Sequence, residues 1–430
     1  MDLAWISLAA LLVAILVSCT TKVNVGFLSL VLAWIIGVYV GGMKVSEITA
    51  GFPAQLFLTL AGVTLLFAEA RVNGTLDRVA HRAVSTCRGN VGLIPVVFFF
   101  IALGLASIGA GNIASAALIA PMAMATAGRV GISAFLITIM VGNGANAGSL
   151  SPFAPTGIIV NGLMDRLGLG GAEWQSYFNN LIAHASVGFA GYFIFGGWRL
   201  FSRTYSEPQV SPETLNPVSE HSDALPASEH SFQPQHWVTL SVIGLLIVGV
   251  IFFDVNVGMG AFAGAVLLIL LRITDEVAAV RAMPWGPILM VCGVTVLIGL
   301  LEKTGGLDLF TAFLARFSTQ ESVTGVVAFV TGLISAYSST SGVVLPAFLP
   351  TVPGLIEKLG GGDPLAVASA MNVGAHLVDV SPLSTIGALC VAAAPAKEDY
   401  RTLFNKVLAW GLSMSVVGAL LCYIFFGLLW

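Results

Sequence analysis

The sequence predicts an all-α polytopic membrane protein built from two inverted-topology repeats. Three observations predict this fold class: an apolar composition, long apolar runs along the whole chain, and motifs of the first half that recur in the second. Of the 430 residues, 57 % are hydrophobic and 9 % are charged, whereas soluble domains carry about 25 % charged residues. This composition excludes a soluble enzyme, a nucleic-acid-binding protein and a secreted disulfide scaffold.

Apolar runs of about 20 residues are long enough to cross a bilayer as helices. Each half of the chain is predicted to contain five such spans, one of them unwound, and one re-entrant hairpin. The predicted spans are 3–21, 25–43, 53–70, 132–165 and 177–200 in the first half, and 237–253, 257–272, 287–302, 364–396 and 403–429 in the second.

Four of these apolar stretches are interrupted. The stretches at about 91–128 and 322–358 contain small polar residues midway, which predicts hairpins that enter the membrane and turn back. The spans at about 132–165 and 364–396 contain glycines and prolines that would unwind a helix. Unwound backbone at membrane depth is tolerated only beside protein or a watery cavity. The four breaks therefore mark the predicted binding site.

A polar segment separates the two halves. Residues 204–236 contain no Lys or Arg and are rich in proline and acidic residues. Such a composition cannot bury enough apolar surface to fold. We therefore predict a first repeat at 1–203, a disordered linker at 204–236 and a second repeat at 237–430.

Short motifs recur in the same order in both halves, which indicates a duplicated unit. Val23–Gly26 recurs as Val255–Gly258, and Ser151-Pro152 recurs as Ser381-Pro382, at an offset of 230 to 232 residues. An odd number of spans in each unit inverts the second copy relative to the first. Most of the 18 Lys and Arg residues then lie on the linker side. The positive-inside rule therefore predicts a cytoplasmic linker and two periplasmic termini, in a cell inner membrane.

The four breaks offer helix N-termini and hydroxyls to an anion, and carbonyls and amides to a cation. No Lys or Arg falls in them, so co-bound cations would help to neutralise a dianion. We expect no catalytic residue, no cofactor and no metal beyond Na⁺ as a coupling ion. The predicted substrate-binding residues are Asn112, Ser151, Pro152, Thr156, Ser339, Thr340, Ser341, Ser381 and Pro382. The predicted cation-binding residues are Gly111, Asn112, Asn143, Asn146, Ser149, Ser338, Thr340 and Asp379.

Two ionisable residues, His376 and Asp379, lie in the second-half break. Ionisable residues inside a membrane are functional candidates by default. The first half has Asn146 and Ser149 at the corresponding positions, so the duplicated architecture does not itself require the charge. A role in cation or proton binding and a packing role both stay open. For His184 we expect a hydrogen-bonded packing role, and Glu69 is expected to reach the membrane interface.

The chain resembles the dicarboxylate carriers named for the malonate carrier MatC, within the ion transporter superfamily that includes the divalent anion/sodium symporters. Phe57–Phe67, Val72–Leu76, Val141–Gly148 and Ser151–Met164 carry the resemblance. It implies a homodimer of scaffold and transport domains that works by an elevator-type movement. In the symporter branch, Ser-Asn-Thr motifs at the hairpin tips bind sodium and carboxylate. Here only fragments remain, at Ala110–Asn112 and Ser339–Ser341, and the two Ser-Pro pairs match the unwound positions better.

Together, these features predict a secondary active transporter of a small dicarboxylate, malonate or a C4 acid, with cation coupling by symport. A cation/proton antiporter or an oxyanion exporter of the same superfamily is the alternative within transport, and a passive channel also stays open. An intramembrane hydrolase is disfavoured because the sequence contains neither a His-Glu-x-x-His nor a Gly-x-Ser-x-Gly motif. The expected partners are the substrate, the lipid bilayer and a second copy of the chain, and no nucleic acid.

Overall fold

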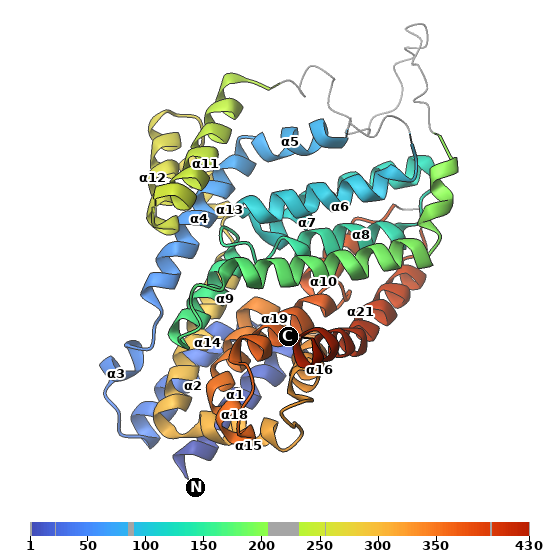
Figure 1. The fold of residues 1–430 in the computed structure, drawn as a ribbon. Coiled ribbons are helices and arrows are strands. Elements are labelled where there is room, and N and C mark those ends of the chain that lie inside the picture. The colour runs from blue at the N-terminus through green and yellow to red at the C-terminus, as the bar shows by residue number, and fades with distance from the viewer. Residues whose placement is uncertain are drawn as a thin grey trace, which may run out of the picture.

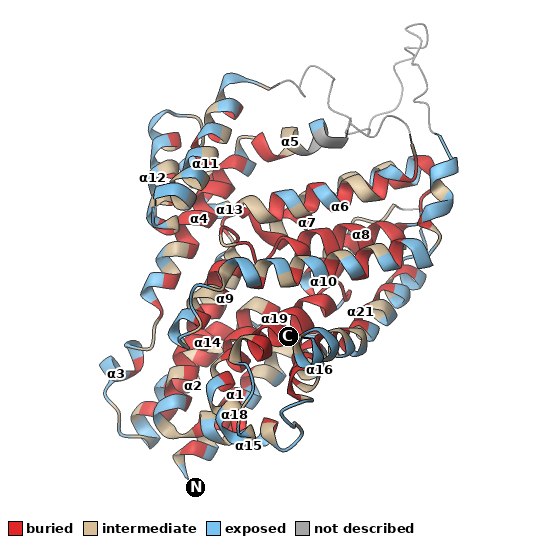
Figure 2. Ribbon diagram, viewed as in Figure 1, coloured by how far each residue is buried: buried red, intermediate tan, exposed pale blue. Residues whose placement is uncertain are grey.

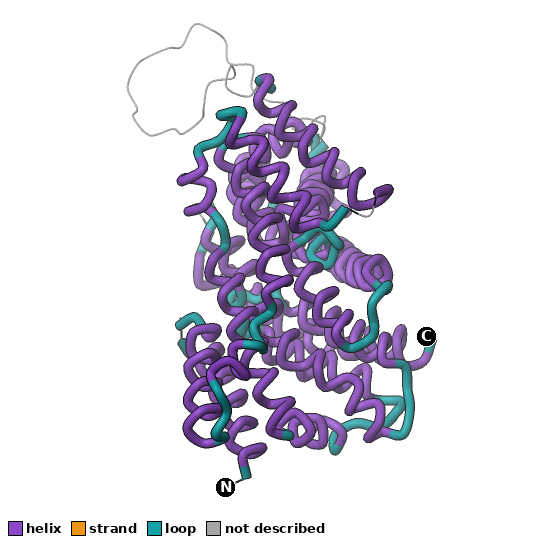
Figure 3. The backbone as a smooth tube through the Cα atoms, turned by 90° about the vertical axis from the view of Figure 1, so that its left-hand side faces the viewer, coloured by secondary structure: helices purple, strands orange, loops and turns teal. Residues whose placement is uncertain are grey.

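The structure is a computed structural model that describes residues 2–21, 23–84, 90–204, 232–253, 255–395 and 398–429. Within these ranges the chain is helical, and its one strand-like feature is an isolated bridge between Asn90 and Thr204 (Figure 3). The all-α prediction is therefore confirmed for the described residues. Of the predicted linker, residues 205–231 lie outside the described residues, and the chain becomes helical again at Pro234.

The helices follow the order of the predicted segments in both halves (Figure 1). Those of the first half are α1 (Leu3–Thr20), α2 (Val25–Trp34), α3 (Val45–Thr49), α4 (Ala54–Val72), α5 (Thr75–Val84), α6 (Leu93–Leu105), α7 (Gly111–Val130), α8 (Ala134–Ala147), α9 (Pro155–Arg166) and α10 (Glu173–Ile194). Wider π-helical turns continue α2 as η1 (Ile35–Val40) and α6 as η3 (Ala106–Ala110), and the 3₁₀ turn η4 (Gly197–Ser202) follows α10.

The second half repeats this order. Its helices are α11 (Pro234–Phe253), α12 (Val257–Leu270), α13 (Glu276–Ala282), α14 (Trp285–Thr304), α15 (Gly306–Ala315), α16 (Val323–Ser335), α17 (Leu345–Phe348), α18 (Val352–Leu359), α19 (Pro364–Val378), α20 (Thr385–Ala392) and α21 (Tyr400–Cys422). Shorter turns are η6 (Thr340–Val344), η7 (Leu349–Thr351) and η8 (Tyr423–Leu428).

Several helices have the length and composition of membrane spans. Large apolar side chains face outward, such as Leu270 and Phe252, each 73 % exposed. Such a surface suits lipid rather than water. In the described part of the chain, six helical stretches are long and apolar enough to cross a bilayer: Leu3–Thr20, Ala54–Val72, Leu93–Val130, Trp285–Thr304, Thr340–Leu359 and Tyr400–Leu428. The prediction of a polytopic membrane protein is confirmed at this level.

In one group of helices, those of the first half pack against those of the second half. In this crossing group, α2 packs against α14 and α12 packs against α4. The Val-Asn-Val-Gly motif begins both α2 and α12. Asn24 and Asn256 cap these helices by accepting hydrogen bonds from the N–H groups of Gly26 and Met259. The crossing group consists of α1, α2, α4, α11, α12 and α14.

Glycines allow the two crossings to be close. A Cβ atom on Gly26 would collide with the backbone of Leu289 on α14, and one on Gly258 would collide with Thr59 on α4. The partner helices carry glycines too, because Gly293 meets Gly26 and Gly62 meets Gly258. The repeated glycine motifs therefore form the same backbone contact twice, each time between one helix of each half.

The remaining long helices form a second group, the hairpin group, made of α6–α10 and α16–α21. In it α6 and α10 pack against α8, while α16, α21 and α10 pack against α19. Residues 136–147 of α8 and 366–378 of α19 are all buried, and Figure 2 shows both helices in the interior. The helices that lead into the two predicted breaks are thus the most enclosed parts of the hairpin group.

Candidate functional site

The first hairpin tip is a glycine turn between α6 and α7. Gly109 and Gly111 have φ values of 124° and 79°, in the region that favours glycine. A Cβ atom on Gly109 would also collide with the ring of Phe67 on α4. The chain can therefore turn while it packs closely against α4. Asn112 then lies in the first turn of α7.

The second hairpin tip is closed by hydroxyl groups. Ser339 caps η6 by accepting a hydrogen bond from the N–H of Gly342, at 3.1 Å. Thr340 and Ser335 share a hydrogen bond of 2.5 Å, and Ser338 bonds to Ser18 of α1 at 2.7 Å. These contacts hold the tip and place Ser341 in the first turn of η6.

Both broken helices fold over a glycine. The first break lies between the end of α8 and the start of α9, and the second lies between α19 and α20. A Cβ atom on Gly157 would collide with the carbonyl oxygen of Ser151, and one on Gly387 would collide with that of Ser381. The two Ser-Pro motifs therefore make equivalent backbone turns. Each turn packs against the helix that follows the break, α9 in the first half and α20 in the second.

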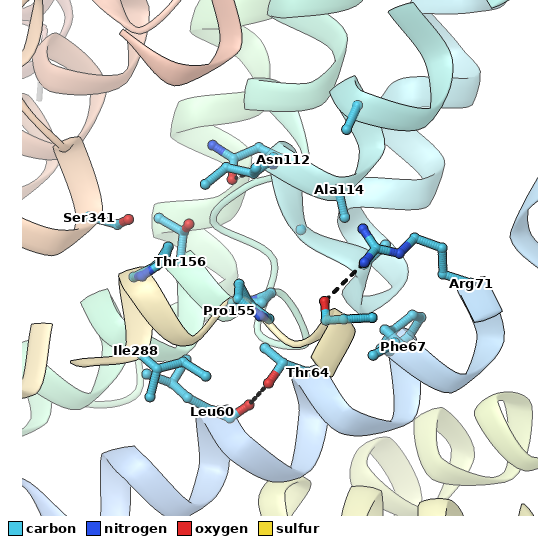
Figure 4. Close-up of a pocket in the computed structure, with 18 of the residues that line it drawn as sticks. Leu60, Thr64, Phe67, Arg71, Asn112, Ala114, Pro155, Thr156, Ile288 and Ser341 are labelled. Atoms are coloured by element: carbon cyan, nitrogen blue, oxygen red, sulfur yellow. Dashed lines mark hydrogen bonds between the residues drawn. The ribbon is translucent and has the colours of Figure 1, made fainter. Parts of the chain in front are cut away.

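A pocket of about 140 Å³ lies where the crossing group meets the tips of the hairpin group. Figure 4 shows Arg71 at one end of it, Thr156 and Ser341 at the other, and Asn112 between them. The lining residues are Leu60, Thr64, Phe67, Ala68, Arg71, Leu76, Ala110, Gly111, Asn112, Ile113, Ala114, Ala117, Pro155, Thr156, Ile159, Ala282, Pro284, Pro287, Ile288 and Ser341.

The pocket gathers residues from three of the four predicted breaks. Asn112, Thr156 and Ser341 lie in the first turns of α7, α9 and η6. Helix N-termini carry partial positive charge and unpaired N–H groups, which favour an anion. Gly111, which we assigned to the cation, lines the pocket as well.

Arg71 is the one charged side chain among the described residues that line the pocket, and the sequence did not single it out as a site residue. It lies in the last turn of α4 and lines the pocket, and its Nη2 atom donates to the carbonyl oxygen of Ala282 at 2.9 Å. No second hydrogen bond of this side chain occurs among the described residues, so further donors can reach a ligand. In the sequence Arg71 follows an apolar span, so it was counted only among the basic residues that predict topology. It lies in none of the four predicted breaks.

Six predicted substrate residues do not line this pocket. Ser151 donates to the carbonyl of Ser107 at 2.6 Å, and Ser381 accepts from the N–H of Leu383 at 3.3 Å. Ser339 and Thr340 hold the second tip, as described above. Pro152 borders a separate recess with Asp165 and Arg166, and Pro382 is buried. These residues shape the breaks from behind rather than facing the pocket.

Three of the predicted cation residues, Asn112, Asn146 and Ser149, form a hydrogen-bonded network behind the pocket. Asn112 donates from Nδ2 to Oδ1 of Asn146 at 2.9 Å, which joins the pocket to the end of α8. Ser149 donates to the carbonyl of Asn146 at 2.7 Å. Asp379 accepts a hydrogen bond from Ser384 across the second break. Asn143 faces α10, where it bonds to His184, and Ser338 lies apart at the second tip.

The expectation for Glu69 is wrong. This side chain is fully buried, and neither carboxylate oxygen has a hydrogen-bond partner among the described residues. The cause is tertiary packing, because α12 and α13 both pack against α4. The packing role expected for His184 agrees with its full burial and its 2.9 Å bond to Asn143.

The described residues contain no group of three or more His, Cys, Asp or Glu side chains that could hold a metal ion. The predicted cation residues therefore offer amide, hydroxyl and carbonyl oxygens and the single carboxylate of Asp379. Oxygen ligands of this kind suit hard cations.

Comparison with known proteins points to membrane transport. Residues 1–149 match a family model described as the N-terminus of the dicarboxylate carrier protein MatC. The fold resembles that of the YdaH transporter of Alcanivorax borkumensis, with a TM-score of 0.61 at 16 % identity, covering 100 % of this chain and 98 % of that one. It also resembles MtrF of Neisseria gonorrhoeae, described within a class of antimetabolite efflux pumps, with a TM-score of 0.52 at 14 % identity over 91 % and 84 % of the chains. No curated protein matches the sequence. The chain thus shares its fold with membrane transporters.

Proposed function

We propose that this chain is a secondary active transporter that carries a small dicarboxylate, malonate or a C4 acid, across the cell inner membrane. The observation that carries this proposal is the pocket in which Arg71 faces the first turns of α7, α9 and η6. The match of residues 1–149 to a dicarboxylate carrier model supports the same substrate class.

The charge of the pocket favours an anion over a cation. Among the described residues that line it, one is basic and none is acidic. The guanidinium of Arg71 can bind a carboxylate through two parallel hydrogen bonds. A second carboxylate of the same molecule would meet Thr156 and Ser341 at the other end, where two helices begin. A cation/proton antiporter would instead need an acidic group in this pocket, so this alternative is the weaker one.

The division of the fold supports alternating access. Arg71 and Thr64 come from the crossing group, while Asn112, Thr156 and Ser341 come from the hairpin group. A movement of the hairpin group along the crossing group would carry the substrate and leave Arg71 behind. We therefore propose that the crossing group is the scaffold, that the hairpin group is the transport domain, and that the movement is of the elevator type.

The remaining assignments follow the same proposal. The glycine contacts that occur twice between the halves support two inverted repeats. The excess of Lys and Arg on the linker side supports two periplasmic termini and a cytoplasmic linker. The homodimer rests on the family resemblance, and the buried network behind Asn112 supports cation coupling.

Uptake into proteoliposomes tests the proposal. The purified chain is reconstituted, and labelled malonate, succinate and citrate are offered under imposed Na⁺ or proton gradients. We expect malonate or succinate to accumulate, and we expect Arg71→Gln to slow this accumulation strongly. The matched control is Arg129→Gln, which removes an exposed arginine of α7 outside the pocket. If none of the three carboxylates enters or leaves the vesicles, the proposed function is wrong. Efflux without uptake would favour the oxyanion exporter.

A further inference from the structure

A polar cluster that the pocket does not use lies where α8, α10 and α19 meet. Each of its side chains is at most 1 % exposed, deep inside the hairpin group. We call it the amide–imidazole cluster, and it consists of Asn143 and Asn146 on α8, Asn180 and His184 on α10, and Asn372 and His376 on α19.

Hydrogen bonds link α10 and α19, the helices that carry the two imidazoles, to the last turns of α8. His184 Nδ1 bonds to Oδ1 of Asn143 at 2.9 Å. Asn180 donates to the carbonyl of Asn146 at 2.7 Å, and Asn146 donates to the carbonyl of His376 at 3.5 Å. The cluster is therefore a unit of three helices, in which side chains of α8 bond to α10 and to α19.

Four atoms of this unit have no partner in the described part of the chain. They are Nε2 of His184, Nε2 of His376, Oδ1 of Asn180 and Oδ1 of Asn372. Buried polar side-chain atoms nearly always have a hydrogen-bond partner. Four exceptions on two adjacent helices therefore indicate a missing ligand rather than a packing defect.

All four atoms are acceptors. The carbonyl of Asn372 can only accept, so His376 Nδ1, which lies 2.7 Å from it, carries the proton. Asn143 donates its amide nitrogen to the carbonyl of Ile139 at 2.9 Å, so its Oδ1 accepts from His184 Nδ1. Both imidazoles thus have a bare lone pair at Nε2, and the two amide oxygens have only lone pairs to offer.

The missing ligand must therefore be a donor or a positive charge. A transition metal needs more ligands than two imidazoles, and the described residues supply no group of three metal-binding side chains. Sodium would find only two amide oxygens here, while imidazole nitrogen is a ligand for softer metals. A proton fits the set best, because it turns one of the two bare imidazole nitrogens into a donor for another acceptor of the cluster.

We propose that the amide–imidazole cluster binds one proton from water, at Nε2 of His184 or His376. The lone pair of that nitrogen forms the new N–H bond, which then donates to one of the three remaining acceptors. The O–H bond of the hydronium ion that brings the proton breaks, its electron pair stays on the oxygen of the released water, and the cluster gains one positive charge. Insofar as this proton drives transport, the inference rests on the proposed function and names the coupling ion.

Few other charged groups surround the two imidazoles. Among the described elements packed against α10 and α19, α8 and α16 contain no titratable side chain. Asp379 follows His376 by three positions and supplies a buried carboxylate, while the thiol of Cys422 donates to the carbonyl of Ala370. The charged residues of α9, α18, α21 and η4 lie at exposed positions: Asp165, Arg166, Glu357, Lys358, Arg199, Arg401 and Lys406.

Nitrogen NMR of the full chain in lipid nanodiscs tests proton binding without any transport. The histidines are labelled with ¹⁵N, and the signals are followed from about pH 8 to 5, the range in which histidine changes charge. The buried imidazoles are recognised by their protection from a soluble paramagnetic quencher, and His184→Gln and His376→Gln assign them. We expect one protected imidazole to lose its bare Nε2 signal and gain a second N–H. If both keep a bare Nε2 over the whole range, or respond to Na⁺ instead of pH, the inference is wrong.

Transport assays separate this inference from the proposed function. Exchange of labelled for unlabelled dicarboxylate without any gradient tests transport alone, and accumulation under a proton gradient tests coupling. We expect His376→Gln to keep exchange within about three-fold of wild type while accumulation falls at least about ten-fold. The control is His236→Gln on α11, outside the cluster. Loss of exchange in the wild-type protein would overturn the proposed function. Intact proton-driven accumulation in His376→Gln and in His184→Gln would overturn the coupling role.

Discussion

The two helix breaks have the same backbone turn but different side-chain chemistry. In each, a glycine packs on the carbonyl of the serine in a Ser-Pro pair, Gly157 on Ser151 and Gly387 on Ser381. The first break has neutral Asn146 and Ser149 at positions where the second has His376 and Asp379. The two breaks therefore share the turn that interrupts the span, while only the second contains ionisable groups. Shape and charge are separable properties in this site.

The same asymmetry recurs on the crossing group. Arg71 ends α4 and lines the pocket, whereas the corresponding position near the end of α14 is Glu302. The ends of α4 and α14 thus carry opposite charges at corresponding positions, so the two helices have unequal ends.

The largest expected effect comes from the shared turn. Gly157→Ala and Gly387→Ala place a Cβ atom 2.0 and 2.2 Å from a carbonyl oxygen, so either the break or the restarting helix must shift. Overpacking of this kind costs about 1–3 kcal/mol or more. We expect both variants to lose uptake and to melt at lower temperature, as measured in proteoliposomes and by thermal unfolding.

Gly104→Ala is the matched control, because a Cβ atom there would meet nothing within 4 Å. It should leave uptake unchanged and stabilise α6 by up to about 1 kcal/mol. Should one of the two break glycines tolerate alanine, the backbones of the two breaks would not be equivalent.

Arg71 and Glu302 test the unequal ends. Arg71→Gln removes a charge-assisted hydrogen bond to the substrate, worth about 1.5–3 kcal/mol, so kcat/KM for dicarboxylate uptake should fall about 10- to 100-fold. Glu302→Gln should change it by less than about three-fold, because this side chain lies outside the described pocket. Equal effects of the two variants would mean that Arg71 has no special role in this pocket.

The two hairpin tips should differ less. Asn112→Ala leaves Oδ1 of Asn146 without its donor, at a cost of about 1–3 kcal/mol. We expect an increase in KM of about ten-fold for Asn112→Ala and about three-fold for Ser341→Ala, since Ser341 offers one hydroxyl at the pocket. Substrate titration of the uptake rate measures both. The reverse order would place the main polar contact at the second tip.

The smallest effect is expected at the start of α21. Asp399 caps this helix through the N–H of Arg401, and the hydroxyl of Thr402 lowers the pKa of Asp399 below its usual range. The corresponding helix α10 has Ala172 at its N-cap, without a side-chain hydrogen bond. Asp399→Ala should lower Tm slightly at neutral pH, and Ala172→Asp should raise it.

The lowered pKa of Asp399 also predicts how this difference in Tm changes with pH. A carboxylate whose pKa is lowered on folding adds stability above its unfolded pKa and loses it as the pH falls through the folded pKa. The Tm difference between wild type and Asp399→Ala should therefore shrink as the pH falls below about 3.9. A difference that persists unchanged in acid would show that the cap does not depend on the charge.

Much of the fold could be predicted from composition and local sequence pattern. Apolar runs predicted the helical membrane architecture, and glycines and prolines marked the places where α8 and α19 end. The recurring Val-Asn-Val-Gly motif was visible, but its role as a cap and a crossing point depends on contacts between the halves. The sequence motif alone does not show which helix packs against a given glycine, because that contact exists only in the folded chain.

The site was only partly predictable for a similar reason. Asn112, Thr156 and Ser341 were predicted because they lie in breaks, and all three line the pocket. Arg71 lies at the end of an intact helix and reaches the pocket through tertiary packing. Glu69 belongs to the same last turns of α4 and is fully buried. Two charged residues on one helix end thus have opposite surroundings, which depend on the neighbours of each face.

The crossing between the halves also imposes an order of assembly. α4 is made early in synthesis, but the helix that packs on its Gly62, α12, follows only in the second half of the chain. Until then α4 must stay in the bilayer without this neighbour, and α2 must likewise await α14. Contacts this distant in sequence form late and slowly. Neither half can complete its own crossing, so a chain interrupted between the halves would leave two helix faces without their partners.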